Sequence, residues 1–434
     1  MEWYYPVVFA IILYAIVAAV IRWCGLFPEN ISFFGPIMAI RTESVGFFDR
    51  FTRYTPLKTF FRAYGTIGVL MVVVISALMT YLLVRTTEIT LLTQPEPTEF
   101  QKPQNILLIP GINEFIPSSF AVWTALVLTI AIHEFGHGIL CRIEGIAVKS
   151  TGLLVAVIPI GAFVEPDEED IDRTHGMAKM RMFGAGIAYN LTIGIACFIV
   201  LVFLLGMVIP SPAPVITGVY QDYPAYEADL PYPSIITMVN GNPVETRNEV
   251  TALLHKTVPG DEITLTVDKE GMLVERTLVL SEWPEELEMD LSSGFMGVTY
   301  YDSERVVTVF GNLASPEGML YLLIAPLNIV PGAEFLRVIP YESVESTYLQ
   351  VPFDRFWSVI HLLFWIGWIN IMVGIFNALP MLPLDGGHIL REGLNRLLER
   401  RGLSRYVDGI VASVSWAVLF MLMTPILLPY LFHL

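Results

Sequence analysis

Residues 119–141 read SFAVWTALVLTIAIHEFGHGILC, an apolar run that carries two histidines four residues apart with a glutamate between them. A helix of roughly 20 apolar residues crosses the ~30 Å hydrocarbon core of a bilayer. Histidines at this spacing share a helix face, where both imidazoles can bind one zinc ion, and Glu134 can reach a water on that ion. The run therefore predicts a membrane helix that binds zinc through His133 and His137.

The setting of this motif strengthens the prediction. Two histidines and a glutamate inside a hydrocarbon-length helix are costly unless they face a metal, a polar cavity or one another, so they indicate function. The alternative is a set of interhelical hydrogen bonds without a metal.

The composition is that of a membrane protein. Of 434 residues, 54% are hydrophobic and 15% are charged, whereas soluble domains carry about 25% charged residues. Further runs of spanning length lie at about 4–23, 66–87, 182–209, 356–379 and 407–432. We therefore predict a polytopic α-helical membrane protein with about six transmembrane helices, of which the first is a retained span.

Basic residues predict the orientation, because cytoplasmic loops are enriched in Lys and Arg. They gather in the loops after the first and third spans and before the last, while the loop after the second span has only Lys102. This places the N-terminus and the region 210–354 outside the cytoplasm, and the zinc motif nearer to the cytoplasmic side. The net charge of −17 is concentrated in 210–354, which argues against nucleic acid as a partner.

Within that outer region, residues 213–283 alternate apolar and polar in short runs separated by turns. We expect strands at 215–220, 235–239, 262–268 and 275–280, with a helix at 247–254. This order, with PAYEADL at 224–230 and IITMVNG at 235–241, resembles a PDZ domain of the bacterial and archaeal membrane-protease type. Such α/β domains bind extended peptides at a sheet edge; the alternative is a rigid spacer.

A catalytic zinc commonly has three protein ligands and a water, so the sequence should supply one more. The candidate is Asp385, in the run FNALPMLPLDGGH at 376–388. Two prolines in this run break a helix and free backbone groups, which membranes tolerate where protein or a water-lined cavity covers them.

An HExxH helix, a later NxxPxxPLDGG and a PDZ-like domain between them resemble the site-2 protease family of intramembrane zinc metalloproteases. The resemblance covers about 119–400 and implies one zinc per chain on His133, His137 and Asp385, with Glu134 as general base. It also implies catalytic roles for two amides. Asn377 matches the second motif and would steady the substrate backbone. Asn190, in AGIAYN at 185–190, would donate to the oxyanion, although Ile187 stands where the family usually has proline.

Two further segments are interpreted through this resemblance. The apolar run 152–164 resembles the family's membrane-embedded β-hairpin, whose edge could hold an unwound substrate as an added strand. His388 is a possible extra ligand. We expect instead that Gly386 and Gly387 turn the chain away, so that His388 caps an amphipathic segment at 389–398.

The expected organisation follows the chain from end to end. It comprises a first transmembrane helix (1–23), a cytoplasmic loop (24–65), a second helix with an outer loop (66–118), a catalytic core (119–209), a PDZ-like domain (210–283), an outer extension (284–354), a catalytic helix with the aspartate motif (355–400) and a last transmembrane helix (401–434).

The predicted activity is hydrolysis of peptide bonds in or beside the transmembrane segments of membrane proteins, in regulated intramembrane proteolysis. In this mechanism zinc lowers the pKa of its water, and Glu134 takes the proton and later gives it to the leaving amine.

One alternative is a non-catalytic adaptor that recruits partners through its PDZ-like domain. Another is a metal transporter, which would need polar residues spread over several spans. A further alternative among enzymes is a membrane metalloprotease of another kind, in which a downstream Glu takes the place of Asp385 as third zinc ligand.

Overall fold

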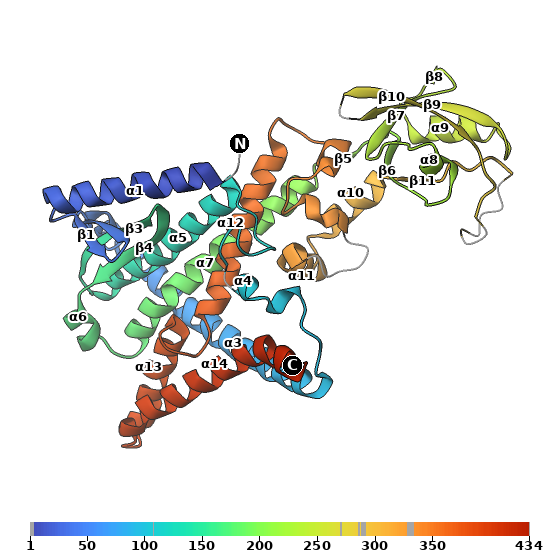
Figure 1. Cartoon of the computed structure of the whole chain (residues 1–434). Helices are drawn as coiled ribbons and strands as arrows, with labels where there is room; N and C mark the ends of the chain where they lie inside the picture. Colours follow the sequence, from blue (N-terminus) through green and yellow to red (C-terminus); the bar gives the residue numbers. More distant parts are fainter. Residues whose placement is uncertain are drawn as a thin grey trace. The chain divides into compact units, whose positions relative to one another are not determined.

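The chain forms two compact units in a computed structural model that describes residues 4–433 except 107, 270, 285–286, 288–291 and 328–333. The membrane unit runs up to Phe198 and resumes at Leu362; the inserted unit is Ile199–His361. The helices of the membrane unit are α1 (Tyr4–Cys24), α2 (Gly46–Asp49), α3 (Thr55–Thr93), α4 (Pro103–Ile106), α5 (Phe120–Glu144), α6 (Glu168–Arg173), α7 (Met177–Leu205), α12 (Phe356–Asn377), α13 (Asp385–Glu399) and α14 (Val407–Phe432), and α7 and α12 continue into the inserted unit (Figure 1).

Five helices of the described chain, α3, α5, α7, α12 and α14, are long and apolar enough to cross a membrane. They match the five predicted spans after the first in position, length and apolar character. In α1, the apolar stretch Ile11–Cys24 falls short of that length, so the first span stays a prediction. A sixth crossing is possible by length and composition if α10 (Ser303–Asn312) and α11 (Pro316–Ile324), which meet at 111°, count as one broken span.

The ends of α5 follow from its sequence. Ser119 precedes the helix, and its side chain accepts a hydrogen bond from the Val122 N–H, which satisfies one of the free amides at a helix start. Gly145 ends the helix with φ of 87°, a left-handed conformation that glycine adopts without steric cost. The zinc motif lies in the second half of this helix.

A four-stranded antiparallel sheet lies in the membrane unit, in the order β1 (Ile31–Phe34), β2 (Ile37–Thr42), β3 (Val148–Ala156) and β4 (Ile158–Pro166). Strands β3 and β4 form the hairpin expected at 152–164. Pairing with β1 and β2, which lie in the predicted cytoplasmic loop, was not expected. It depends on Gly152, because a Cβ there would come 2.2 Å from the Ile40 carbonyl oxygen. Helix α1 lies along this sheet (Figure 1), and its Tyr14 hydroxyl donates to the Val155 carbonyl at 2.9 Å.

An ionic cluster around one buried carboxylate joins the ends of three membrane helices. The Glu144 carboxylate, whose side chain is 3% exposed, lies 3.1 Å from Arg181 and 3.4 Å from Arg62. Glu144 ends α5, Arg181 lies in the first turns of α7, and Arg62 lies near the start of α3. The cluster therefore holds the zinc-motif helix to both neighbours at one end.

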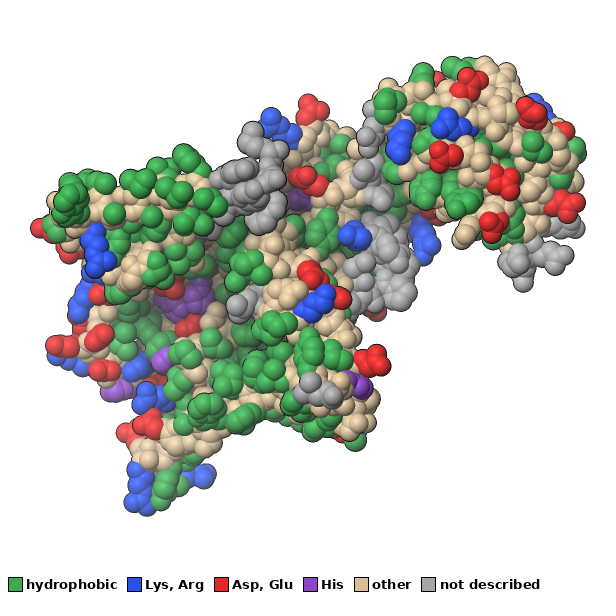
Figure 2. Space-filling view, viewed as in Figure 1, with side chains coloured by type: hydrophobic (Ala, Val, Ile, Leu, Met, Phe, Trp, Pro, Cys, Tyr) green, Lys and Arg blue, Asp and Glu red, His purple; other side chains and the backbone are tan. Residues whose placement is uncertain are grey.

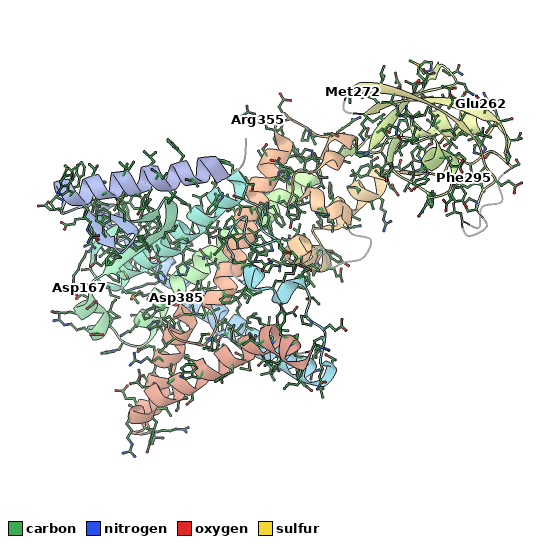
Figure 3. All side chains as sticks on the ribbon, viewed as in Figure 1. Asp167, Glu262, Met272, Phe295, Arg355 and Asp385 are labelled. Carbon is green, nitrogen blue, oxygen red and sulfur yellow. The ribbon has the colours of Figure 1, made fainter. Side chains whose placement is uncertain are left out.

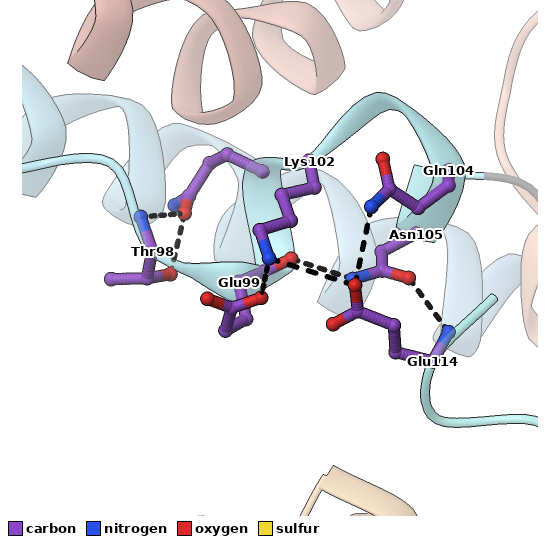
Figure 4. Close-up of polar contacts among 7 residues, drawn as sticks. Thr98, Glu99, Lys102, Gln104, Asn105 and Glu114 are labelled. Atoms are coloured by element: carbon purple, nitrogen blue, oxygen red, sulfur yellow. Dashed lines mark hydrogen bonds and ion pairs between the residues drawn. The ribbon is translucent and has the colours of Figure 1, made fainter.

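The loop between α3 and α5 is ordered by polar contacts (Figure 4). Lys102 forms an ion pair with Glu99 and lies 3.6 Å from Glu114. The Gln104 amide donates to the Glu114 carboxylate, and the Glu114 backbone N–H donates to Oδ1 of Asn105. The hydrogen bond to Glu99 raises the pKa of Lys102, and the hydrogen bond from Gln104 lowers the pKa of Glu114. Both side chains are therefore charged around neutral pH.

The inserted unit contains an antiparallel sheet in the order β10-β9-β7-β6-β11, with β8 beside β7. The elements are β5 (Ile209–Pro210), β6 (Val215–Val219), α8 (Pro224–Glu227), β7 (Ser234–Val239), β8 (Asn242–Pro243), α9 (Arg247–Leu254), β9 (Glu262–Lys269), β10 (Met272–Val279), β11 (Val298–Tyr300) and β12 (Leu349–Gln350), together with α10 and α11. The four expected strands and the helix at 247–254 are confirmed, and β11 extends the sheet past residue 283. Buried aliphatic side chains, among them Ile236, Leu265 and Val267, form its core.

One local expectation is wrong. Gly386 and Gly387 do not turn the chain away, because α13 begins at Asp385 and includes both. Their lack of a side chain serves packing instead: a Cβ on either would come 2.4 Å from backbone atoms of the preceding 378–382 segment. His388 lies in the first turn of α13 and does not cap a later segment.

We expect Glu144→Gln to lower the free energy of unfolding by about 2 kcal/mol, because the loss of a buried anion leaves the largely buried Arg181 guanidinium without its ionic partner. Denaturant unfolding in detergent micelles measures this. The matched control is Glu169→Gln, which breaks an exposed pair with Arg173 at 2.9 Å and should change stability by less than about 1 kcal/mol. Equal effects of the two substitutions would contradict a structural role for the cluster.

Candidate metal centre

Three side chains from two distant segments converge in the membrane unit. Helix α5 presents His133 and His137 one turn apart, with their Nε2 atoms 3.1 Å from each other. The Oδ2 atom of Asp385, the first residue of α13, lies 3.1 Å from Nε2 of His133 and 3.3 Å from Nε2 of His137. Among the described residues these three form the candidate metal-ligand cluster, with ligand atoms within 4.8 Å of one another.

The donor set fits zinc. Two ligands at 2.0–2.2 Å from a tetrahedral zinc lie roughly 3.3 Å apart, close to the separations among these three atoms. The Asp385 Oδ2 atom is buried and lacks a hydrogen-bond donor, as expected for an oxygen that faces a cation. The three side chains are 12–16% exposed, so water can reach the position between them.

The site opens onto one face of the membrane unit. In Figure 2, histidine and acidic side chains gather at the bottom of a hollow between α1 with its sheet and α13. Figure 3 labels Asp385 in this region, at the start of α13. The position between the three ligand atoms is therefore open to this face of the membrane unit.

Glu134 is held by the edge of the sheet. Its Oε2 atom accepts a hydrogen bond from the Val164 backbone N–H at 3.0 Å. Strand β4 ends the strand order, with β3 on its other side, so this N–H belongs to the unpaired edge. The sequence did not reveal this contact, because it joins a helix to a strand edge through a backbone atom.

Helix α7 packs directly over the two histidines. The His137 Nδ1 atom lies 2.8 Å from the Met182 carbonyl oxygen. A Cβ on Gly186 would come 2.6 Å from both His133 Cε1 and His137 Nε2, so the absence of a side chain leaves room for the rings. Gly186 lay in the quoted small-residue motif, but its role was not recognised.

The other predicted residues occupy different positions. Asn190 is fully buried, with Nδ2 at 3.3 Å from His133 Nδ1. Asn377 ends α12, and its amide donates to the Val373 carbonyl at 3.1 Å. His388 stacks on Phe183 with ring centroids 4.3 Å apart and lies outside the three-residue cluster.

Comparison with known proteins identifies the family. The model of peptidase family M50 matches residues 121–422, more than half of the chain. The chain belongs to peptidase family M50. This confirms the predicted site-2 protease membership, and the matched range includes both segments of the metal centre.

The relatives extend the comparison at low identity. The chain is 23% identical over 430 residues to the uncharacterized protein MJ0971 of Methanocaldococcus jannaschii, covering 93% of this chain and 95% of the relative. The zinc metalloproteases RasP of Oceanobacillus iheyensis and Geobacillus kaustophilus are 24% and 23% identical, each match covering 58% of this chain and 58% of the relative. A solved PDZ domain of an SdrC-like protein from Listeria monocytogenes is 18% identical and covers 22% of this chain and 93% of its own, with a TM-score of 0.19.

We expect Gly186→Ala to weaken zinc binding by at least about 10-fold, because the added methyl displaces the imidazoles that bind the metal. Zinc affinity is measured by competition with a chelating dye. The control is Gly184→Ala on the same helix, where a Cβ meets nothing closer than 3.5 Å and zinc affinity should not change. Equal affinity in the two variants would contradict this packing account.

Proposed function

We propose that this member of family M50 is an intramembrane zinc metalloprotease that hydrolyses peptide bonds in or beside the transmembrane segments of membrane proteins. One zinc per chain is held by His133, His137 and Asp385. The observation that carries the proposal is the convergence of two imidazole nitrogens and one carboxylate oxygen beside Glu134, with both imidazoles on α5, a helix of membrane-spanning length.

The chemistry divides between the metal and the chain. Zinc at this site supplies Lewis acidity toward water and the scissile carbonyl. Glu134 accepts a proton from the attacking water and returns it to the leaving amine, which is general acid–base catalysis by one carboxylate. The Val164 N–H orients this carboxylate. Asn377, directly before the turn that leads to Asp385, is the amide that we propose steadies the substrate backbone.

The substrate is presented in an extended form. Backbone carbonyls in a helix are hydrogen-bonded within the helix, so the segment to be cut must unwind. Strand β4 offers an unpaired edge that passes Glu134, and an unwound segment can add to it as a further strand. Single-span membrane proteins with helix-weakening residues are therefore the proposed substrates, in regulated intramembrane proteolysis.

The orientation that we propose rests on the basic loops. The N-terminus and the inserted unit lie outside the cytoplasm, and the metal centre lies nearer to the cytoplasmic side of the bilayer, because Lys and Arg gather in alternate loops. The cut is then expected close to the cytoplasmic end of the substrate helix.

The PDZ-like domain, residues 214–300, is proposed to act on access to the enzyme. Its strand β11 is a sheet edge, and a cavity of about 560 Å³ is lined by β11, by Arg247 and Thr251 of α9, and by His255 directly after α9. An extended peptide fits beside such an edge. A substrate or partner end bound there would select which proteins enter the membrane site.

We expect Glu134→Gln to abolish cleavage while the protein keeps close to one zinc, because Glu134 acts on water and is not a ligand. A purified single-span substrate in detergent, with metal content measured on the same sample, tests this. The paired variant Asp385→Ala removes a ligand and should lose both zinc and activity. Retained turnover in Glu134→Gln would contradict the role of Glu134 as general base, whereas an unsubstituted protein that binds zinc and cuts no membrane substrate would favour the adaptor alternative.

Deletion of residues 214–300 should leave zinc binding and the cutting of short substrates intact, because the domain supplies none of the ligands. Its ends lie together, since the Tyr301 N–H donates to the Val215 carbonyl at 2.9 Å, so a short flexible linker can join them. We expect the deletion to admit substrates with large external domains. Cleavage of one substrate with a short or a long external domain measures the effect, and an unchanged size preference would contradict selection by this domain.

A further inference from the structure

Helix α7 faces the metal centre with three residues spaced four apart. Met182, Gly186 and Asn190 share one helix face, as His133 and His137 do on α5. Met182 meets His137 through its carbonyl, Asn190 meets His133 through its amide, and Gly186 lies against both rings. The two helices therefore run in opposite directions at this contact. Met182 meets His137, Asn190 meets His133, and Gly186 between them leaves room for both rings.

When one ring nitrogen of a histidine binds a metal, the protonation and the hydrogen-bond partner of the other ring nitrogen follow from it. Both Nε2 atoms point at Asp385 Oδ2, so Nε2 is the ligand atom of each ring. A neutral imidazole that binds through Nε2 carries its proton on Nδ1, and that N–H requires an acceptor. The Met182 carbonyl, 2.8 Å away, is the acceptor for His137.

His133 has an amide in the corresponding place. The Asn190 Nδ2 atom lies 3.3 Å from His133 Nδ1, which would set two N–H donors against each other. The Asn190 Oδ1 atom is buried and has no hydrogen-bond partner. A half-turn of the amide exchanges two groups of nearly equal size. After this rotation the Asn190 Oδ1 atom accepts a hydrogen bond from the Nδ1–H of His133, so both groups have a partner.

We propose that Asn190 is a positioning residue of the metal centre, which accepts a hydrogen bond from Nδ1–H of His133 and fixes the ring with Nε2 toward the metal. This inference rests on the proposed zinc site. It replaces the role of oxyanion donor expected from the sequence, because Asn190 meets the ring on the nitrogen opposite the ligand atom. The Met182 carbonyl and Asn190 Oδ1 then serve the two histidines in the same way.

Substitutions at position 190 separate the two roles, with zinc affinity measured by chelator competition beside kcat and KM. Asn190→Leu removes the acceptor and should weaken zinc binding by about 10–100-fold. Asn190→Asp keeps an acceptor and should hold zinc within a few-fold of the unsubstituted protein. An oxyanion donor predicts another pattern, in which both variants keep zinc and lose kcat, and that result would overturn the inference.

Asn370→Leu is the matched control for packing. Asn370 is also fully buried, and its amide donates at 2.8 Å to Thr129, one turn before His133 on α5. The loss of this bond should lower stability without changing zinc affinity. If Asn370→Leu weakens zinc as much as Asn190→Leu, the effect is general loosening and the inference fails. If the unsubstituted protein binds no zinc, the proposed function itself fails.

Discussion

The close approach of α5 and α7 is the contact on which the catalytic arrangement depends. In a bilayer, lipid tails are as apolar as helix side chains, so helices associate through tight packing and buried polar contacts, and small residues allow that approach. Gly136 on α5 packs near Ala185, where a Cβ would come 3.0 Å from a carbonyl oxygen, and Gly186 on α7 leaves space for two imidazoles. A larger residue at either position would separate α5, which carries the two candidate histidine ligands, from α7, which packs over their rings.

Buried polar contacts then fix the register of the neighbouring helices. Thr129 and Asn370 join α5 to α12, and the Glu144 cluster joins α5 to α3 and α7. The Glu392 carboxylate of α13 accepts from the Gly176 N–H at the start of α7, where a negative charge also meets the helix dipole favourably. Each contact is costly to break in an apolar surrounding, so together they stabilise the packing of the helices around the candidate metal centre.

The small sheet offers the edge at which we propose that a substrate segment binds. Strand β4 binds Glu134 through its backbone and keeps an unpaired edge. Exposed edges invite pairing with another chain, and in a membrane each free backbone group needs a partner. An edge beside the general base therefore suits an enzyme that must hold an unwound segment and cut it in the same place.

Local sequence alone determined the long apolar helices, four strands and one helix of the inserted unit, and the candidate metal ligands. Apolar runs predict helices of spanning length because hydrophobicity is a property of the run itself, and His133 and His137 share a face because a helix repeats every 3.6 residues. The motif around Asp385 and the helix at 247–254 were likewise readable within a few residues, as was family membership through the two motifs together.

Only the tertiary structure decided how distant segments complete the site. The pairing of β1 and β2 with the hairpin, the bond from Val164 to Glu134 and the orphaned oxygen of Asn190 arise between segments that no local period links. Asn190 shows the difference most clearly. Its motif marked it as catalytic, but its contact with Nδ1 of His133 comes from the packing of α7 on α5. The sequence determined that an amide stands there, and the packing determined which side of the imidazole it meets.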